Sequence, residues 1–344
     1  MNNQKILITG GAGFVGSNLT IQLLKQFNPK KIILVDNLLS SEASTIISDP
    51  KVSFIFGSIA DDRILNRLPT DLDYVFHLSC YHGNQSSIAD PIQDHQNNSF
   101  TSLKLFDWLQ KIKKIKKIVY AAAGCAVAEK KYGNVGPTDE DAPISLFHDS
   151  PYSISKLLGE FYGNYYYKQY NLPFVKARFQ NIYGPREYLG AGQWRGTIHT
   201  IWRNVIPTFI WKAIHGENLF LDNEGLSSRD FIYVEDIVKG LILCAQKGES
   251  GEAYNLASGV ETQIKDVAKH ILEITKSKSK IDLMPKRDWD NSGNRFGSTK
   301  KSKIKLDFEA KTKIRYGLEK TIDWTIKNKT LIKSLINKHN IYLS

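Results

Sequence analysis

Short apolar runs alternate with amphipathic stretches along the first half of the chain. The runs at 5–9, 31–36, 52–57 and 74–78 have the length of strands, and a helical pattern begins at Gly13, shortly after the first run. Strands that alternate with helices favour a parallel, doubly wound sheet, because each crossover helix covers one face of it. We therefore predict a Rossmann-type α/β fold.

The alternation continues to about residue 180 and then breaks. Helices are expected over 98–110 and 152–169, and strands over 117–122 and 174–179. The sequence from 186 to about 227 is rich in Gly and Trp, and strands at 229–234 and 253–257 are expected to return to the main sheet. We predict a Rossmann domain of 1–180 plus 228–260, and a smaller C-terminal substrate lobe of 181–227 plus 261–344.

Composition excludes several classes of protein. The 344 residues are 42% hydrophobic and 24% charged, as in an ordinary globular protein, and no apolar run approaches the roughly 20 residues that span a bilayer. The start lacks the pattern of a signal peptide, so a cytoplasmic protein is expected. Cys80, Cys125 and Cys244 are far apart, which predicts neither disulfides nor a metal site.

The net charge of +11 does not by itself indicate nucleic-acid binding. The densest lysine run, 111–117, ends a predicted helix, where lysines complement the helix dipole. A basic cleft would equally suit an anionic diphosphate, so no nucleic-acid or membrane partner is predicted.

A glycine-rich turn follows the first strand and opens a helix. Gly10, Gly13 and Gly16 would let the backbone approach a pyrophosphate at the helix N-terminus. The second strand ends in Asp36, about 20 residues on, where a carboxylate accepts hydrogen bonds from the adenosine ribose hydroxyls. The carboxylate would repel a 2′-phosphate, so we predict NAD rather than NADP.

Tyr152 and Lys156 lie one helical turn apart on the same face of a predicted helix. An ammonium close to a phenol favours the phenolate, which would lower the pKa of Tyr152 towards the working pH. The pair therefore predicts a general base.

The ordered motifs resemble those of the NAD-dependent epimerase/dehydratase family. They are the glycine turn, Asp36, the runs 77–80, 178–185 and 229–236, Asn98, and Tyr152 with Lys156. The resemblance implies an extended short-chain dehydrogenase/reductase that holds NAD tightly, binds a nucleoside-diphosphate sugar between its lobes and transfers a hydride at a sugar carbon. It also implies a homodimer built on the helices near Asn98 and Tyr152.

By this resemblance, NAD would contact Gly10, Gly13, Phe14, Val15, Gly16, Asp36, Asn37, Ser58, Ile59, Leu78, Ser79, Cys80, Asn98, Ala121, Tyr152 and Lys156. The substrate diphosphate would contact Asn181, Arg229 and Arg287, since guanidinium groups bind phosphate oxygens in pairs. On sequence alone, Arg229 could equally pair with a nearby carboxylate.

The family's Ser or Thr before the catalytic Tyr is missing here. Depending on the alignment, Ala123 or Gly124 takes its place. Cys125 resembles the acid/base cysteine of GDP-mannose 3,5-epimerases and GDP-fucose synthases, but Arg195 stands where the former have a lysine acid. By the same resemblance, Arg195 would contact the substrate. Cys125 could also be a packing residue, and His82 could supply a polar contact to the sugar or lie on the surface.

These observations predict an NAD-dependent nucleotide-sugar epimerase that oxidises carbon 4 transiently, with Tyr152 and Lys156 as catalytic residues. Two alternatives remain open. The first is a 3,5-epimerase or a 4-dehydrogenase/4-keto reductase that uses Cys125, and the second is a redox-inert NAD-binding regulatory protein.

Overall fold

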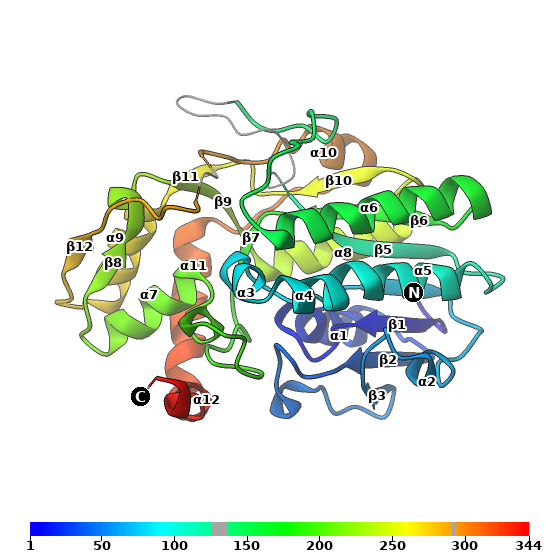
Figure 1. The fold of residues 1–344 in the computed structure, drawn as a ribbon, viewed down its shortest axis with the longest axis horizontal. Helices are drawn as coiled ribbons and strands as arrows, with labels where there is room; N and C mark the ends of the chain where they lie inside the picture. Colours follow the sequence, from blue (N-terminus) through cyan, green and yellow to red (C-terminus); the bar gives the residue numbers. More distant parts are fainter. Residues whose placement is uncertain (125–135, 291–292, 344) are drawn as a thin grey trace.

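Seven parallel strands form the central sheet of the computed structural model, which describes residues 1–124, 136–290 and 293–343 (Figure 1). Their order across the sheet is β10-β6-β5-β4-β1-β2-β3. The order reverses between β1 and β4, and ligands of doubly wound folds bind at such a point. The strands are β1 (Lys5–Thr9), β2 (Lys31–Asp36), β3 (Val52–Phe56), β4 (Tyr74–His77), β5 (Lys117–Ala123), β6 (Phe174–Phe179) and β10 (Ala253–Leu256).

Helices cover both faces of this sheet, because successive residues of each buried strand face opposite sides. Ile6 and Ile8 join one core with α1 (Phe14–Gln26) and α8 (Val234–Lys247). Leu7 joins a second core with α5 (Thr101–Leu109) and α6 (Pro151–Tyr170), which run side by side in Figure 1. The predicted Rossmann-type α/β fold is therefore confirmed.

The second lobe holds two small sheets. One contains β7 (Asn181–Tyr183), β9 (Ser228–Tyr233) and β11 (Glu261–Gln263), and the other contains β8 (Leu219–Leu221) and β12 (Ile281–Leu283). Their apolar side chains pack on three helices, α7 (Val205–Ile214), α9 (Ile264–Thr275) and α11 (Ile314–Lys327).

The expectation that β9 returns to the main sheet is wrong. β9 pairs with β7 and β11 instead. Its side chains explain the error, because Ile232 packs into the core beside α8 while Phe231 and Tyr233 face the core of the second lobe. A strand buried on both faces reads the same in sequence whichever sheet it joins. The proposed division into two domains stays a prediction.

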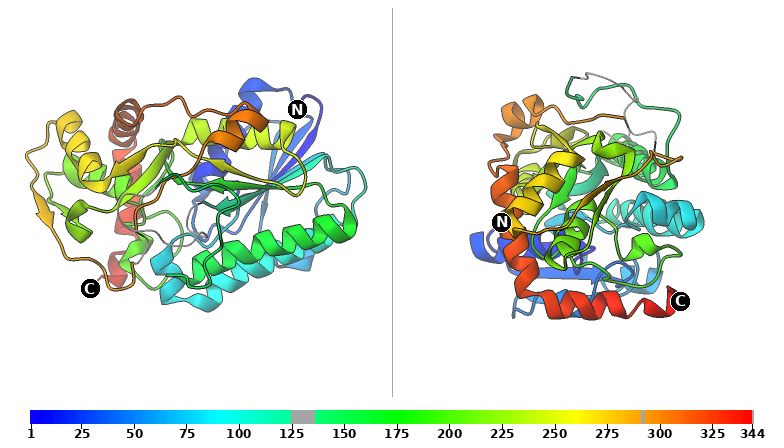
Figure 2. Two further views of the ribbon diagram at one scale, coloured as in Figure 1. Left: turned by 90° about the horizontal axis from the view of Figure 1, so that it is seen from above. Right: turned by 90° about the vertical axis from the view of Figure 1, so that its left-hand side faces the viewer.

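A long connection, residues 186–204, leaves β7 and crosses towards the segment after β2. We call it the strap. Helix α12 (Lys329–Asn337) packs against it through Ile332 and Leu335, and Figure 2 shows this helix along the lower edge of the molecule. Trp194 of the strap stacks on Tyr342 with ring centroids 4.9 Å apart.

The remaining short helices are α2 (Asp62–Leu65), α3 (Asn84–Ala89), α4 (Pro91–Asp94) and α10 (Lys300–Leu306). A π-helical stretch (His95–Phe100) joins α4 to α5. Within the described ranges, no helix is both long enough and apolar enough to cross a membrane.

Candidate active site

One cavity of about 450 Å³ lies at the carboxyl ends of the central strands and extends into the second lobe. Most of the predicted site residues line it together. They are Gly10, Gly13, Phe14, Val15, Gly16, Asp36, Asn37, Ser58, Ile59, Leu78, Ser79, Cys80, His82, Ala121, Tyr152, Lys156, Asn181 and Arg287. Asn98, Arg195 and Arg229 do not line it.

The glycine turn fits a bound pyrophosphate. Gly10 has a φ of +72°, and a Cβ there would lie 2.7 Å from the backbone nitrogen of Ser79. A Cβ at Gly16 would collide with the Gly10 carbonyl. No side chain caps the N-terminus of α1 and its first turn holds no acidic residue, so its backbone N–H groups are left for an anion.

Asp36 is held rigidly at the end of β2. It accepts hydrogen bonds from the backbone N–H groups of Ala12 (3.1 Å) and Leu38 (2.8 Å) and from the Ser41 hydroxyl (2.9 Å). Burial raises the pKa of the Asp36 carboxyl, while these hydrogen bonds act in the opposite direction. The carboxylate is therefore fixed where the resemblance places the adenosine ribose.

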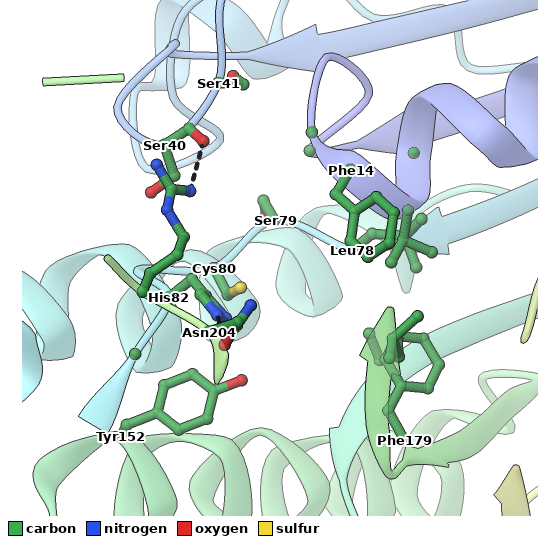
Figure 3. A pocket seen from close by; sticks show the side chains of 18 of the residues that line it. Phe14, Ser40, Ser41, Leu78, Ser79, Cys80, His82, Tyr152, Phe179 and Asn204 are labelled. Atoms are coloured by element: carbon green, nitrogen blue, oxygen red, sulfur yellow. Dashed lines mark hydrogen bonds between the residues drawn. The ribbon is translucent and has the colours of Figure 1, made fainter. Parts of the chain in front are cut away.

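Tyr152 and Lys156 both come from the first turns of α6 and line the cavity, and Figure 3 shows the Tyr152 phenol pointing into it. The expected lowering of the Tyr152 pKa does not occur in the protein alone. Burial raises the pKa of Tyr152, and a hydrogen bond with the Cys80 thiol adds to the rise. Burial also lowers the pKa of Lys156, whose ammonium lies 4.7 Å from the centre of the Tyr120 ring. Desolvation is the largest cause of the pKa shift of each group.

Asn98 lies behind the cavity wall, in the π-helical stretch. It accepts a hydrogen bond from the backbone N–H of Tyr81 (2.7 Å) and donates to Asp94 (2.7 Å) and to Ser155 (3.1 Å). Asn98 therefore connects α6 to the segment that carries Cys80. The neighbouring Asn97 lines the cavity instead.

At Gly124, one of the two positions where the hydroxyl is expected, there is little space for a side chain. Gly124 lines the cavity beside Ala123, and a Cβ at Gly124 would collide with the carbonyl of Phe179 and lie 2.5 Å from Nε2 of Gln180. No Ser or Thr fits at 124 without movement of β6. Cys125 lies outside the described residues.

A second polar group lies close to the Tyr152 phenol. The His82 ring packs edge-on against the Tyr152 ring, with the two ring centroids 6.2 Å apart. Its Nε2 lies 3.4 Å from Oδ1 of Asn204 (Figure 3). The Asn204 amide donates in turn to Glu187. Burial lowers the pKa of His82 to about 4 and raises that of Glu187 to about 7. Sequence reasoning named His82 but missed Asn204 and Glu187.

Two arginines of the strap, the buried Arg195 and the partly buried Arg203, hold the segment that follows Asp36. Arg195 donates to the Ser40 hydroxyl (2.8 Å) and to the Leu39 carbonyl (3.3 Å), and Arg203 donates to the Ser40 carbonyl (3.0 Å). Arg195 therefore does not line the cavity but supports the segment that forms its cofactor side. Arg203, which lines the cavity, was missed.

The far end of the cavity is rich in arginine. Arg287 lines it and pairs with Asp222 at 2.5 Å. Arg229 is partly buried, does not line the cavity and lies 3.5 Å from Asp290. Arg229 thus has a carboxylate neighbour, and its contact with the substrate stays a prediction. Arg295 also lines this end but was missed, because the surrounding sequence has no regular pattern.

This combination of fold and site defines an NAD-binding enzyme class, and comparison confirms it. The model of the NAD dependent epimerase/dehydratase family matches residues 6–257. The chain belongs to this family, and its cofactor is NAD.

Among solved structures, the chain is similar to the Bordetella bronchiseptica enzyme WbmF in complex with NAD⁺ and UDP. The two share 50% identity over 99% of this chain and 98% of that one, with a TM-score of 0.90.

Curated relatives carry different activities. The chain is 31% identical to a putative UDP-glucose 4-epimerase of Methanocaldococcus jannaschii, over 77% of this chain and 81% of that protein. It is also 31% identical to a dTDP-D-glucose 4,6-dehydratase of Dictyostelium discoideum, over 79% of this chain and 62% of that protein. The chain spans only 47% of a trifunctional relative from Arabidopsis thaliana. The family therefore includes both epimerases and dehydratases.

Proposed function

We propose that the protein epimerises a nucleoside-diphosphate sugar at carbon 4 through a transient keto sugar. The observation that carries this proposal is the shared cavity, in which Tyr152 and Lys156 lie between the glycine turn and the arginine-rich end. Bound NAD supplies a hydride acceptor that returns the hydride. Tyr152 takes and later restores the proton of the hydroxyl at carbon 4, and Lys156 orients the nicotinamide ribose and adds positive charge.

The arginine-rich end supports a diphosphate in the substrate. Arg287 and Arg295 line the cavity where it extends into the second lobe, and guanidinium groups bind phosphate oxygens well. The relative crystallised with UDP favours a uridine nucleotide. We propose a UDP-sugar as substrate.

The 3,5-epimerase alternative requires an acid to work opposite Cys125. Its sequence candidate, Arg195, is buried outside the cavity wall and bonded to Ser40. A guanidinium is also a poor proton donor. These observations favour chemistry at carbon 4.

The test is incubation of the purified, NAD-loaded protein with UDP-glucose, UDP-N-acetylglucosamine and their uronic acids in heavy water. We expect a 4-epimer of at least one sugar, with no deuterium bound to carbon. Deuterium at carbon 3 or 5 that disappears in Cys125→Ser would establish the alternative instead. A redox-inert regulatory protein would bind NAD and convert no sugar.

We also propose that two copies pair through α5 and α6. Ile154, Phe161 and Tyr165 of α6 are each about half exposed. Light scattering should give twice the monomer mass for the parent, and Phe161→Glu should lower it.

A further inference from the structure

Neither Ala123 nor Gly124 carries a hydroxyl, so the reacting sugar lacks the family's hydroxyl partner. Any replacement must lie on the cavity wall next to the Tyr152 phenol and carry a hydrogen-bonding atom that the protein itself leaves open. His82 meets these conditions, because it lines the cavity and its ring contacts Tyr152 edge-on.

The neighbours of His82 fix the position of its ring proton. Glu187 accepts a hydrogen bond from Nδ2 of Asn204, so the amide oxygen of Asn204 must face His82. An amide oxygen only accepts, which places the proton of His82 on Nε2. The other ring nitrogen, Nδ1, then carries a lone pair and accepts hydrogen bonds.

Burial and the surrounding charges keep the His82 ring neutral. Burial is the largest cause that disfavours a second proton on the ring, and the charges of Arg203, Arg195 and Lys156 act in the same direction. The pKa of about 4 means that the ring stays an acceptor at neutral pH. Among the described residues, Asn204 is the one hydrogen-bond partner that His82 has.

We propose that His82 replaces the missing Ser or Thr as a substrate contact, with Nδ1 accepting a hydrogen bond from a sugar hydroxyl beside Tyr152. Asn204 and Glu187 act as positioning residues that hold the required tautomer. This inference rests on the proposed function, because it concerns the sugar end of the same cavity.

The experiment separates binding of the sugar from binding of the nucleotide. His82→Phe keeps a ring against Tyr152 but has no acceptor, whereas His82→Gln keeps an acceptor oxygen. His270→Phe, a half-buried histidine on α9 outside the cavity, is the matched control. Each NAD-loaded variant is titrated calorimetrically with UDP, UDP-glucose and UDP-N-acetylglucosamine, and turnover is measured.

We expect His82→Phe to bind UDP and retain NAD like the parent. It should lose the extra affinity that the sugar adds, and its kcat should fall by about 10- to 100-fold, the effect of one buried hydrogen bond. His82→Gln should stay within a few-fold of the parent. A merely structural role for His82 would not be rescued by Gln or spare UDP binding.

Turnover and sugar affinity of His82→Phe within threefold of the parent would overturn the inference. Equal loss of UDP affinity would also overturn it, since His82 would then hold the nucleotide. If the parent converts no nucleotide sugar, the proposed function fails. The difference in affinity between UDP and UDP-sugars still decides whether His82 contacts the sugar.

Discussion

Tyr152 is buried against Cys80 and His82, and in the protein alone its phenol stays protonated. Lys156 cannot reverse this by itself, because burial also disfavours the lysine's own charge. Bound NAD⁺ would add a positive charge that favours the phenolate. We therefore expect Tyr152 to act as a base only in the protein that holds oxidised cofactor.

Replacement of Tyr152 by Phe removes only the phenolic oxygen. We expect turnover to fall by about 100-fold or more, in the range of lost acid–base catalysis, while the NAD content of the purified protein is unchanged. Product analysis and cofactor release by denaturation measure the two effects. Turnover within a few-fold of the parent would reject Tyr152 as the base.

His77, at the end of β4, makes folding sensitive to acid. It is buried, with Nδ1 2.6 Å from Oγ1 of Thr9, and burial lowers its pKa from 6.5 to about 3. Between these two values the unfolded chain binds a proton that the folded chain does not, so stability falls as the pH falls. From pH 7 to pH 5 this costs about 2 kcal/mol.

Urea unfolding at both pH values tests this expectation. The parent should lose about 2 kcal/mol more than His77→Gln between pH 7 and pH 5, because the variant lacks the titrating ring. Equal losses in the two proteins would show that His77 is protonated in the folded state.

The residues that sequence could predict are those with a fixed place relative to a strand end or a helical turn. Gly10, Asp36, Tyr152 and Lys156 are of this kind. Asn204 and Glu187 come from the strap, whose sequence has no period, so only the folded chain brings them to His82. For the same reason Arg195 was assigned to the substrate although it supports Ser40.

At the scale of elements, the short apolar runs identified the strands of the central sheet, and the helical pattern identified α1, α5 and α6. The pairing partners of the strands were harder to predict from the sequence. We assigned β9 to the wrong sheet because both of its faces are buried. The segment after β5 shows how two elements constrain one residue, since β6 and its following residue occupy the space beside Gly124.

Gly124→Ser should therefore not restore the family's hydroxyl. We expect the added side chain to displace the Phe179 carbonyl, which lowers the midpoint of thermal unfolding by several degrees and reduces turnover. Gly136→Ser is the matched control, because a Cβ there meets nothing within 4 Å. An unchanged midpoint together with higher activity in Gly124→Ser would contradict the steric argument.

At the scale of the whole molecule, the strap contacts two parts of the chain that are distant in sequence, the segment after β2 and the C-terminal residues after α12. Gly192 donates its N–H to Glu42, which follows β2, and Glu42 also pairs with Lys338. His339 contacts the carbonyl of Gly190 at 2.8 Å. The cofactor side of the cavity is thus held from the far end of the chain.

Loss of the Trp194–Tyr342 stack should therefore speed the release of NAD. An aromatic pair is worth about 0.5 to 1.5 kcal/mol, so Trp194→Ala and Tyr342→Ala should each raise the dissociation rate by about 2- to 10-fold. The dissociation rate of the double variant should be close to that of each single variant, because both changes remove the same contact.

Release of bound NAD into an excess of a competing analogue gives the rate. Tyr316→Ala, an exposed tyrosine on α11, is the control. Unchanged rates in all variants would show that the stack does not hold the cofactor side.

The double anchoring of the strap also limits how relatives can exchange specificity. A chimera that receives residues 186–204 from another family member keeps the contacts of the strap with Glu42 and Tyr342 only if the donor segment fits these residues. Such a chimera has to exchange three segments together, namely the strap, the segment after β2 and the chain from α12 onwards. Natural recombination at a single crossover would face the same barrier.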